Sequence, residues 1–238
     1  MAVIMMRLDK YLADMGIGTR TEVKKYVRQG KVKLDGVVVK TPDMKVDVQL
    51  QEVLYMDQPV RYEEFEYYML NKPAGVVSAT TDEKDKTVID LITDKKRKDL
   101  FPVGRLDKDT EGLLLITNDG ELAHRLLAPK KHVDKVYYAK VKGVVTDEDV
   151  KAFKEGVSIG QDEMAMPSDL EILVSDEISE IRLTIQEGKF HQVKRMFLSV
   201  GKEVVYLKRL SMGSLVLDAN LPLGAYRPLT REELEQLC

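Results

Sequence analysis

A run of four consecutive apolar residues, Leu113 to Ile116, constrains the fold of this chain more than any other feature. The charged segment GRLDKDTEG precedes the run and the turn signal NDG follows it, a pattern typical of a buried strand. Arg105, Asp107 and Asp109 therefore stand at the entrance to that strand. They form either a turn that happens to be charged or a site where a carboxylate is held at a strand end for chemistry.

The rest of the chain mixes helix and strand patterns without a regular series of βαβ units. Beyond the first 64 residues, helices are predicted at 86–96, 121–128, 146–155, 191–200 and 230–237. Strands are predicted at 67–71, 113–116, 135–142 and 181–186. Pro73 cannot donate a backbone hydrogen bond to a sheet, so the first of these strands ends there.

Residues 1–48 carry the patterns of a small separate unit. Helical spacing predicts a first helix from the apolar residues Leu8, Tyr11, Leu12 and Met15. Thr19 and Glu22 form a capping-box pattern that begins a second helix, and Gly30 ends it. The letters KVKLDGVVVK then predict two short strands joined at an Asp-Gly turn.

Basic residues gather on one face of the second predicted helix. At about 100° per residue, a narrow arc contains Arg20, Lys24, Arg28 and Lys31. Residues 1–48 hold ten Lys or Arg against six Asp or Glu, whereas the rest of the chain holds 27 against 34. The face is either solvated surface or a stripe that contacts phosphates, and spacing alone does not decide between them.

The whole chain is weakly acidic, with a formal net charge of -3, which argues mildly against a general nucleic-acid coat protein. Cys238 is the only cysteine, so no internal disulfide is expected and a reducing compartment is indicated. The apolar opening is too short for a signal peptide, and no stretch approaches the roughly 18 apolar residues of a membrane span. These features predict a cytoplasmic protein that does not act in a membrane.

No pattern for a metal or a bound cofactor is present. The spacings of His124, His132 and His191 match no zinc pattern, and structural or surface roles are expected for all three. The chain also lacks a phosphate loop, a dinucleotide fingerprint and a nucleophilic-serine motif. If the chain is an enzyme, the chemistry is expected to be cofactor-free.

Asp107 and Asp109 are the carboxylates best placed for such chemistry. In an extended segment they point to opposite sides, so we expect at most one to be central, and they do not form the facing pair of most glycosidases. A single aspartate can act at a sugar carbon if a cation keeps it ionised. Candidate cations are Lys72, Lys135, Lys194 and Arg195, and candidate aromatics for stacking on a base are Tyr137 and Tyr138.

Four motifs resemble those of pseudouridine synthases and occur in the order of that family. GRLDKDTEGLLLITNDG is similar to the central motif, whose R-L-D triplet carries the catalytic aspartate, and YYMLNKPAGVVSATTD resembles the first motif. DKVYYAKV resembles the segment with the stacking tyrosine, and LTIQEGKFHQVKRMF resembles the later motif with a basic residue near the aspartate. Lys194 is a mild departure, since many members have arginine there.

Residues 1–48 resemble the small RNA-binding domain first described in ribosomal protein S-four, through RLDKYL and GTRTEVKKYVRQGKVKLDG. The whole arrangement is like that of the bacterial RsuA-type enzymes, which modify small-subunit ribosomal RNA. Related enzymes that act on large-subunit RNA usually have Asn-Arg where this chain has His191-Gln192.

The resemblance implies an isomerisation in which a uridine is detached at its N-glycosidic bond and rejoined to the same sugar carbon through C5. Asp107 would attack that carbon or remove the neighbouring sugar proton, Lys194 would keep Asp107 ionised, and Tyr137 would stack on the base. Arg105 would hold RNA or fill the space of the flipped nucleotide, whereas Asp109 is expected to be a loop or turn residue. Other RNA contacts are expected from Arg20, Lys24, Arg28, Lys31 and Arg195.

The implied fold is α+β, with a mixed, largely antiparallel sheet and flanking helices behind a small α/β RNA-binding domain. We expect that domain at 1–48, a flexible linker or an edge strand leading out of it at 49–64, and the catalytic domain at 65–238. The expected partner is ribosomal RNA, from the small subunit or a partly assembled subunit, with no metal, no cofactor and a monomeric enzyme. The alternatives are an enzyme of the same family acting on large-subunit RNA, a non-catalytic ribosome-binding protein and an RNA-independent glycosidase.

Overall fold

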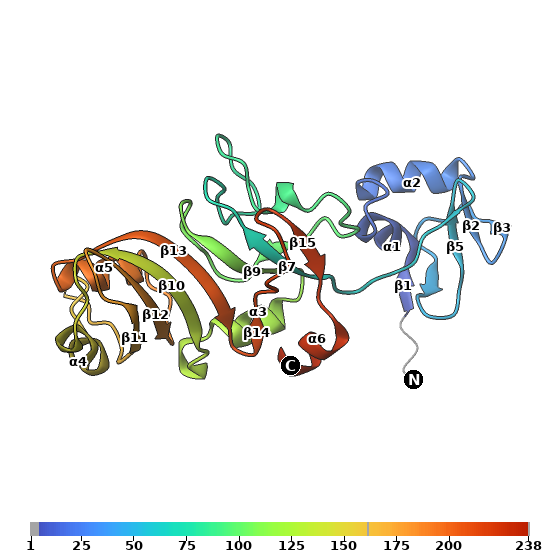
Figure 1. Cartoon of the computed structure of the whole chain (residues 1–238). Coiled ribbons are helices and arrows are strands. Elements are labelled where there is room, and N and C mark those ends of the chain that lie inside the picture. The colour runs from blue at the N-terminus through green and yellow to red at the C-terminus, as the bar shows by residue number, and fades with distance from the viewer. Residues whose placement is uncertain (1–4, 161, 238) are drawn as a thin grey trace. The chain divides into compact units, whose positions relative to one another are not determined.

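The computed structural model describes residues 5–160 and 162–237, which separate into two compact units (Figure 1). The smaller unit, called the head below, consists of the chain up to Glu66 together with Asp94–Leu100. The larger unit, called the sheet unit, consists of Tyr67–Thr93 and the chain from Phe101 on. Cys238 lies outside the described residues.

Two helices pack together in the core of the head, as the sequence predicts. They are α1, Leu8–Asp14, and α2, Arg20–Arg28. The backbone N–H of Glu22 donates to the Thr19 hydroxyl at 3.3 Å, and the N–H of Thr19 donates to the Glu22 carboxylate at 2.7 Å. The capping box is therefore confirmed, and the four apolar residues predicted for the first helix are buried in the head core.

Short antiparallel strands complete the head. β2 and β3 meet at Asp35 and Gly36, whose positive φ angles of 49° and 78° are those that an Asp-Gly turn permits. The four-stranded sheet has the order β3-β2-β5-β6, and β1 pairs separately with β4. The strands are β1 Met5–Arg7, β2 Val32–Leu34, β3 Val37–Val38, β4 Lys45–Asp47, β5 Val53–Tyr55 and β6 Gln58–Pro59.

Residues 49–64 are not a linker, because they carry two strands of the head sheet. β5 pairs with β2 in the register Leu34↔Val53, and Val53 is buried in the head core. Met56 and Asp57, with φ angles of 49° and 63°, turn the chain from β5 into β6. Met-Asp is not one of the usual Asn-Gly or Asp-Gly turn signals, so local reasoning did not detect this hairpin.

The chain returns to the head after the sheet unit has begun. Within Asp94–Leu100, the side chain of Arg97 is buried, with its guanidinium 2.6 Å from Asp99 and 3.6 Å from Asp14. The backbone N–H of Arg97 donates to the Glu66 carboxylate at 2.8 Å. The basic run at 95–98 is therefore partly internal to the head.

The helix predicted at 86–96 is reduced to one 3-10 turn, η1, Ile89–Leu91. The Thr87 hydroxyl and backbone N–H both donate to the carboxylate of Asp90, at 2.9 and 2.8 Å. This cap begins the 3-10 turn. At Asp94 the chain becomes part of the head, so the turn does not continue into a longer helix.

One mixed sheet with flanking helices makes up most of the sheet unit, which confirms the expected α+β fold (Figure 1). The strand order is β11-β12-β10-β13-β9-β7-β15, with β14 beside β13 and β8 beside β9. Of the pairings between these strands, β9–β13 is parallel and the others are antiparallel.

The strands are β7 Tyr67–Lys72, β8 Phe101–Pro102, β9 Glu111–Thr117, β10 Lys135–Lys142, β11 Asp169–Val174, β12 Ile178–Ile185, β13 Glu203–Met212, β14 Leu215–Val216 and β15 Tyr226–Pro228. The helices are α3 Gly120–Leu127, α4 Asp147–Glu155, α5 Gln192–Ser199 and α6 Arg231–Leu237, with a 3-10 turn η2 at Pro129–Lys131.

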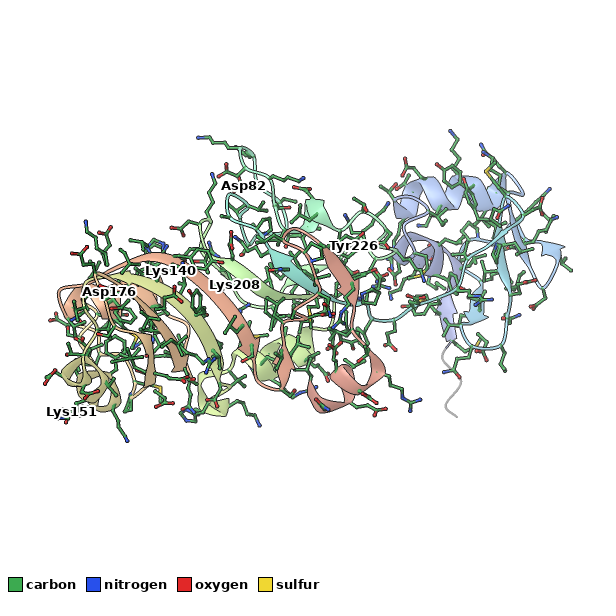
Figure 2. The ribbon with its side chains drawn as sticks, in the orientation of Figure 1. Asp82, Lys140, Lys151, Asp176, Lys208 and Tyr226 are labelled. Atoms are coloured by element: carbon green, nitrogen blue, oxygen red, sulfur yellow. The ribbon has the colours of Figure 1, made fainter. Side chains whose placement is uncertain are left out.

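The two faces of β10 differ in burial, as strand alternation requires. Residues at odd positions from Lys135 to Val141 are buried, and those at even positions are half-exposed or exposed. Lys140, at an even position of β10, is half-exposed, and so is Lys208 on the neighbouring β13 (Figure 2). The buried set includes Tyr137, so the strand directs this side chain into the molecule.

β9 is the buried strand that the sequence predicts. Leu113 to Ile116 have no exposed surface, and Leu113 and Leu115 pack in one cluster with Leu122 and Leu126 of α3. Each fully buried leucine contributes about 2 kcal/mol relative to an exposed one, so β9 is a firm support for the charged segment before it.

No helix in the described part of the chain is long and apolar enough to cross a membrane.

Candidate active site

The charged segment before β9 is a turn rather than an extended strand end. The backbone N–H of Thr110 donates to the carbonyl oxygen of Asp107 at 3.1 Å, which closes the chain around residues 108–109. Before the turn, the hydroxyl of Ser78 donates to the carbonyl of Leu106 at 2.8 Å and accepts the N–H of Leu106 at 3.1 Å. The backbone on both sides of Asp107 is therefore held in place.

Lys72, the last residue of β7, holds the same turn from inside. Its side chain is fully buried, and its ammonium donates to the carbonyl oxygens of Asp107, Lys108 and Thr110 at 3.0, 3.3 and 2.8 Å. Burial lowers the pKa of Lys72 to about 8, against the opposite effect of the nearby Asp109 and Asp107 carboxylates. Lys72, a candidate cation for the aspartate, thus holds the backbone of the turn that carries Asp107.

Lys194 approaches this turn from α5. Its ammonium lies 3.1 Å from Asp107 Oδ2 and donates to both carboxylate oxygens of Asp109, at 2.6 and 2.9 Å. The hydrogen bonds from Lys194 lower the pKa of Asp109. Burial lowers the pKa of Lys194, but its hydrogen bonds to the two aspartates prevail and raise it, so the ammonium stays charged.

This arrangement corrects one expectation. Asp107 and Asp109 were expected on opposite sides of an extended segment, yet they share one cation. The turn at residues 108–109 is the reason, because it reverses the direction in which the second side chain points. Asp109 is nevertheless a turn residue with a salt bridge, as expected, and its side chain is 72% exposed.

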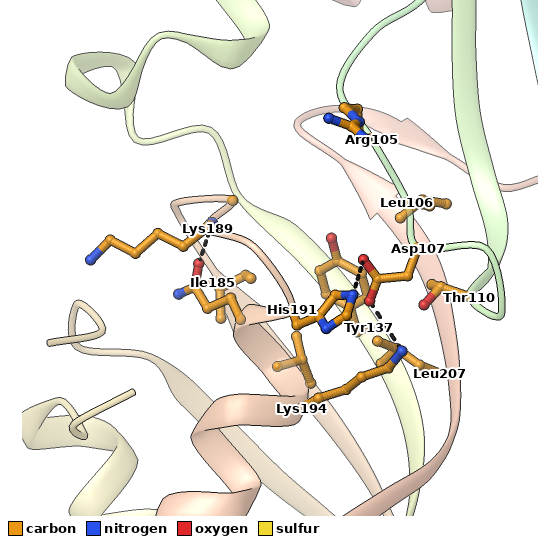
Figure 3. A pocket seen from close by; sticks show the side chains of 13 residues that line it. Arg105, Leu106, Asp107, Thr110, Tyr137, Ile185, Lys189, His191, Lys194 and Leu207 are labelled. Atoms are coloured by element: carbon orange, nitrogen blue, oxygen red, sulfur yellow. Dashed lines mark hydrogen bonds and ion pairs between the residues drawn. The ribbon is translucent and has the colours of Figure 1, made fainter. Parts of the chain in front are cut away.

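His191 and Tyr137 complete the surroundings of Asp107 (Figure 3). His191 Nε2 lies 3.6 Å from Asp107 Oδ1, and the buried ring of Tyr137 lies beside both residues in Figure 3. Tyr138 belongs to the other face of β10, where its ring meets Tyr206 edge-on at 6.0 Å. Of the two tyrosines, the structure therefore places Tyr137 at the site.

These residues line an open pocket with about 400 Å³ of free space. Asp107 is the one carboxylate among the described residues of its lining, which also includes Arg105, Tyr137, His191, Lys194 and Leu207. His191 was not predicted at this site, because a structural or surface role was expected for it. Its position three residues before Lys194, at the start of the same helix, is the local signal that points to it.

Arg105 and Arg195, both predicted to contact RNA, differ in their surroundings. Arg105 is exposed at the pocket, where it is available to a ligand. The guanidinium of Arg195 donates to the carbonyl oxygens of Ile159 and Gly160 at 2.6 and 3.1 Å, and it lies 3.0 Å from a Glu163 oxygen. Because these groups engage its guanidinium, we assign Arg195 a structural role in place of an RNA contact.

The basic stripe of the head lies outside the head core. Arg20, Arg28 and Lys31 are exposed, whereas Lys24 is half-exposed, with its ammonium 3.8 Å from the buried carboxylate of Asp9. Lys24 is therefore partly engaged within the head. The other three remain open to an anionic partner.

Metal ligands are not clustered in the part of the chain that the structure describes. No group of three or more His, Cys, Asp or Glu side chains among those residues is arranged to hold a metal ion. His124 and His132 are exposed, in agreement with the surface roles expected for them.

Comparison with known proteins decides the family. Residues 66–199, more than half of the chain, match the family described as RNA pseudouridylate synthase, and residues 6–51 match the S4 domain. The "Ribosomal small subunit pseudouridine synthase A" of Haemophilus influenzae is 40% identical over 98% of this chain and 99% of its own length. This chain is an RNA pseudouridine synthase of the RsuA family. The protein of the same description in Escherichia coli is 38% identical to this pseudouridine synthase, over 96% of this chain and 98% of its own length.

Two further relatives span almost the whole synthase. The "Uncharacterized RNA pseudouridine synthase YtzG" of Bacillus subtilis is 53% identical over 98% of both chains. A solved structure described as "Crystal structure of pseudouridylate synthase" is 39% identical, with a TM-score of 0.68 over 98% of this chain and all of its own. These matches confirm the family, the fold and the isomerase activity that the four motifs and the head implied.

Proposed function

We propose that this synthase converts a uridine of small-subunit ribosomal RNA into pseudouridine, with Asp107 acting on the sugar. The observation that most directly supports this role is that Asp107 is the one carboxylate among the described residues lining the pocket. The Lys194 ammonium lies 3.1 Å from that carboxylate and places a positive charge beside it. Asp109 shares the same cation but does not line the pocket.

In the proposed reaction the target uridine leaves its stack and enters the pocket. The bond from N1 to the sugar carbon C1′ breaks, the detached uracil turns, and a bond from C5 to C1′ forms. The proton on C5 is lost and N1 takes up a proton, so the product is an isomer of the substrate. Asp107 either attacks C1′ or removes the proton of the neighbouring sugar carbon, and both routes require an ionised carboxylate.

Other residues of the proposed site bind and orient the RNA. The buried ring of Tyr137 stands beside Asp107, a position suited to stacking on the uracil and assisting transfer of the C5 proton. Arg105, exposed at the pocket, holds a phosphate or fills the space that the flipped nucleotide leaves. In the head, the residues that contact phosphates are Arg20, Lys24, Arg28 and Lys31.

Small-subunit RNA is the substrate class that the relatives favour. Two proteins described as ribosomal small subunit pseudouridine synthase A are 40% and 38% identical to this chain over nearly its whole length. The S4 domain at residues 6–51 supports binding to ribosomal RNA.

The role of Asp107 is tested by Asp107→Asn, assayed by release of tritium from C5-labelled uridine in RNA. We expect at least a hundredfold loss of rate, about 2.7 kcal/mol of barrier, because an amide can neither attack C1′ nor accept the proton. The matched control is Asp109→Asn, which changes the other carboxylate on Lys194 and should keep most of the activity. A tenth of the parent rate in the Asp107 variant, or a dead Asp109 variant, contradicts the assignment.

The substrate is tested by offering the enzyme small-subunit RNA, large-subunit RNA and partly assembled small subunits, each labelled at C5. Tritium release from the first or the third alone is the expected result. Release from large-subunit RNA alone contradicts the proposed substrate, and Asp107→Asn, run beside each sample, shows whether any release comes from this site. Mapping pseudouridine in cells that lack the protein then identifies the uridine.

A further inference from the structure

Phe190 is 75% exposed although it lies next to the active-site pocket. It occupies the loop between β12 and α5, immediately before His191, which lines the pocket. Single exposed apolar residues are common on protein surfaces and need no explanation by themselves. Phe190 differs from such residues because its ring is stacked on His191, which also contacts Asp107.

His191 lies against one face of the Phe190 ring. The two ring centroids are 3.8 Å apart and the planes are inclined by 19°, which is a stacked arrangement. His191 has a φ of +48°, a left-handed backbone conformation that is uncommon for residues other than glycine. With one face of Phe190 covered by His191 and most of the side chain exposed, the opposite face is open to solvent.

Several hydrogen bonds hold this loop in place. The Glu187 carboxylate accepts the side-chain amide of Gln192 at 2.6 Å and the backbone N–H of Met166 at 2.8 Å. The Gln192 side chain in turn accepts the backbone N–H of Lys189 at 2.9 Å. The aromatic pair therefore rests on an ordered loop, so little conformational freedom is lost when a ligand stacks on it.

The same pair is close to the reacting carboxylate of the proposed site. His191 Nε2 lies 3.6 Å from Asp107 Oδ1, and the same imidazole is stacked on the Phe190 ring, so one histidine contacts both residues. A group that lies on the open face of Phe190 is therefore near the nucleotide that Asp107 attacks.

We propose that the open face of Phe190 stacks on a base of the RNA next to the target uridine. A uridine that leaves its stack deprives its neighbours of a stacking partner, and an ordered aromatic ring beside the pocket replaces that partner. Because every base has a π-face, this contact contributes affinity and position without selecting a base by hydrogen bonds. The inference rests on the proposed site around Asp107 and adds a substrate contact that the four motifs do not assign.

The first test compares Phe190→Ala and Phe190→Tyr in the tritium-release assay on naked RNA. We expect KM to rise about 5- to 100-fold in the alanine variant, the usual effect of losing one stacked base, with kcat within about twofold of the parent. Phe190→Tyr keeps a stacking ring and should restore the KM of the parent. Leu198→Ala, which removes an exposed apolar side chain from the following helix α5, is the control and should change neither value.

The second test uses the absence of tryptophan from the sequence. Phe190→Trp places the single indole at this position, and we expect its fluorescence to be quenched when the RNA binds. An RNA with an abasic site replacing one neighbour of the target uridine should lose that quenching, whereas abasic sites farther away should not. Binding measured in an Asp107→Asn background excludes turnover as the cause of the signal.

Three outcomes overturn the proposal. An alanine variant with the parent KM, or a tryptophan variant that binds RNA without quenching, shows that Phe190 is only solvated surface. A KM effect seen with partly assembled subunits and not with naked RNA shows that Phe190 contacts a protein. Failure of the Asp107 assignment gives a different result from failure of the Phe190 proposal. If Asp107 is not the reacting carboxylate, Asp107→Asn remains active, while the neighbouring base still quenches the Phe190→Trp fluorescence.

Discussion

Among single residues, Lys72 shows how the site is positioned without contact with the substrate. Its buried ammonium donates to three backbone carbonyls of the turn that carries Asp107. We therefore classify Lys72 as a positioning residue rather than a catalytic one. Its pKa of about 8, lowered by burial, places its titration just above neutral pH.

We expect Lys72→Met to lower kcat at least tenfold, about 1.4 kcal/mol of barrier, because the turn loses the donors that hold it. In the parent enzyme kcat should fall as pH rises through about 8, since a neutral amine has fewer hydrogens to donate. The methionine variant should lack that fall. The measurement is a pH profile of kcat between about pH 6.5 and 9.5 at saturating RNA.

Unfolding does not account for this alkaline decline. The folded pKa of Lys72 lies below the unfolded value of 10.5, so between the two the unfolded chain binds more protons. The contribution of Lys72 to stability therefore rises with pH across that window. Lys108→Met is the control, because its ammonium is exposed and paired with Asp85. Parent-like kcat in the Lys72 variant contradicts the positioning role.

At the scale of elements, the parallel junction of β9 and β13 joins the two halves of the sheet. Gly112 pairs with Arg209 there and has a φ of +100°. A Cβ at this position meets the carbonyl oxygen of Arg209 at 2.2 Å and its nitrogen at 2.8 Å, so the strands can approach this closely only at glycine. The same junction sets Tyr137 and Leu207, from β10 and β13, beside the turn that precedes β9.

We expect Gly112→Ala to lower the free energy of unfolding by at least about 3 kcal/mol, because backbone strain and a backbone clash add together. Urea unfolding followed by circular dichroism is the measurement. Gly120→Ala is the matched control: its Cβ meets no atom within 4 Å, and it begins α3. The control should be neutral or stabilised by up to about 1 kcal/mol. Equal stability of the two variants contradicts the close-approach argument.

At the scale of the whole molecule, the head and the sheet unit are joined by more than one crossing of the chain. The head includes Asp94–Leu100, which follows the first strand of the sheet unit in the sequence. Deleting residues 1–66 therefore removes Asp14 and Glu66, two of the partners of the buried Arg97. Point substitutions on α2 test the function of the head more cleanly than a truncation.

We expect Arg20→Ala, Lys24→Ala and Arg28→Ala in combination to weaken RNA binding uniformly across sequences. The slope of log K against log salt should flatten by roughly two to three units, since each lost phosphate contact removes about 0.9 or less. The kcat on saturating RNA should change little, because Asp107 belongs to the other unit. RNA binding at a series of salt concentrations measures the effect.

The control for this experiment removes three other exposed head lysines, Lys25, Lys40 and Lys45. It subtracts the same charge without touching the stripe, so its salt slope should stay close to that of the parent. If the stripe variant binds as tightly as the parent at moderate salt, the stripe is only a solvated face. The affinity then comes from the sheet unit, around Arg105 and Lys194.

Local sequence was sufficient for features whose determinants lie within a few residues of one another. The capping box of Thr19 and Glu22, the Asp35-Gly36 turn and the buried run Leu113–Ile116 follow from short-range hydrogen bonding, turn geometry and burial, and all three are present. The choice of Asp107 over Asp109 came from the resemblance of its R-L-D triplet to the central motif of pseudouridine synthases, because the charged segment alone did not decide between the two.

The family resemblance placed Lys194 and Tyr137 near Asp107, but only the tertiary structure decided the other contacts of the site. Lys194 and Asp109 are 85 residues apart in the sequence, and their contact depends on how α5 packs against the turn. The sharing of one cation by two aspartates, the carbonyl contacts of Lys72 and the approach of His191 arise in the same way. The strands at 53–59 and the return of Asp94–Leu100 to the head also depend on partners distant in sequence. Propensity and periodicity describe each segment separately, whereas these contacts are set by the packing of segments against one another.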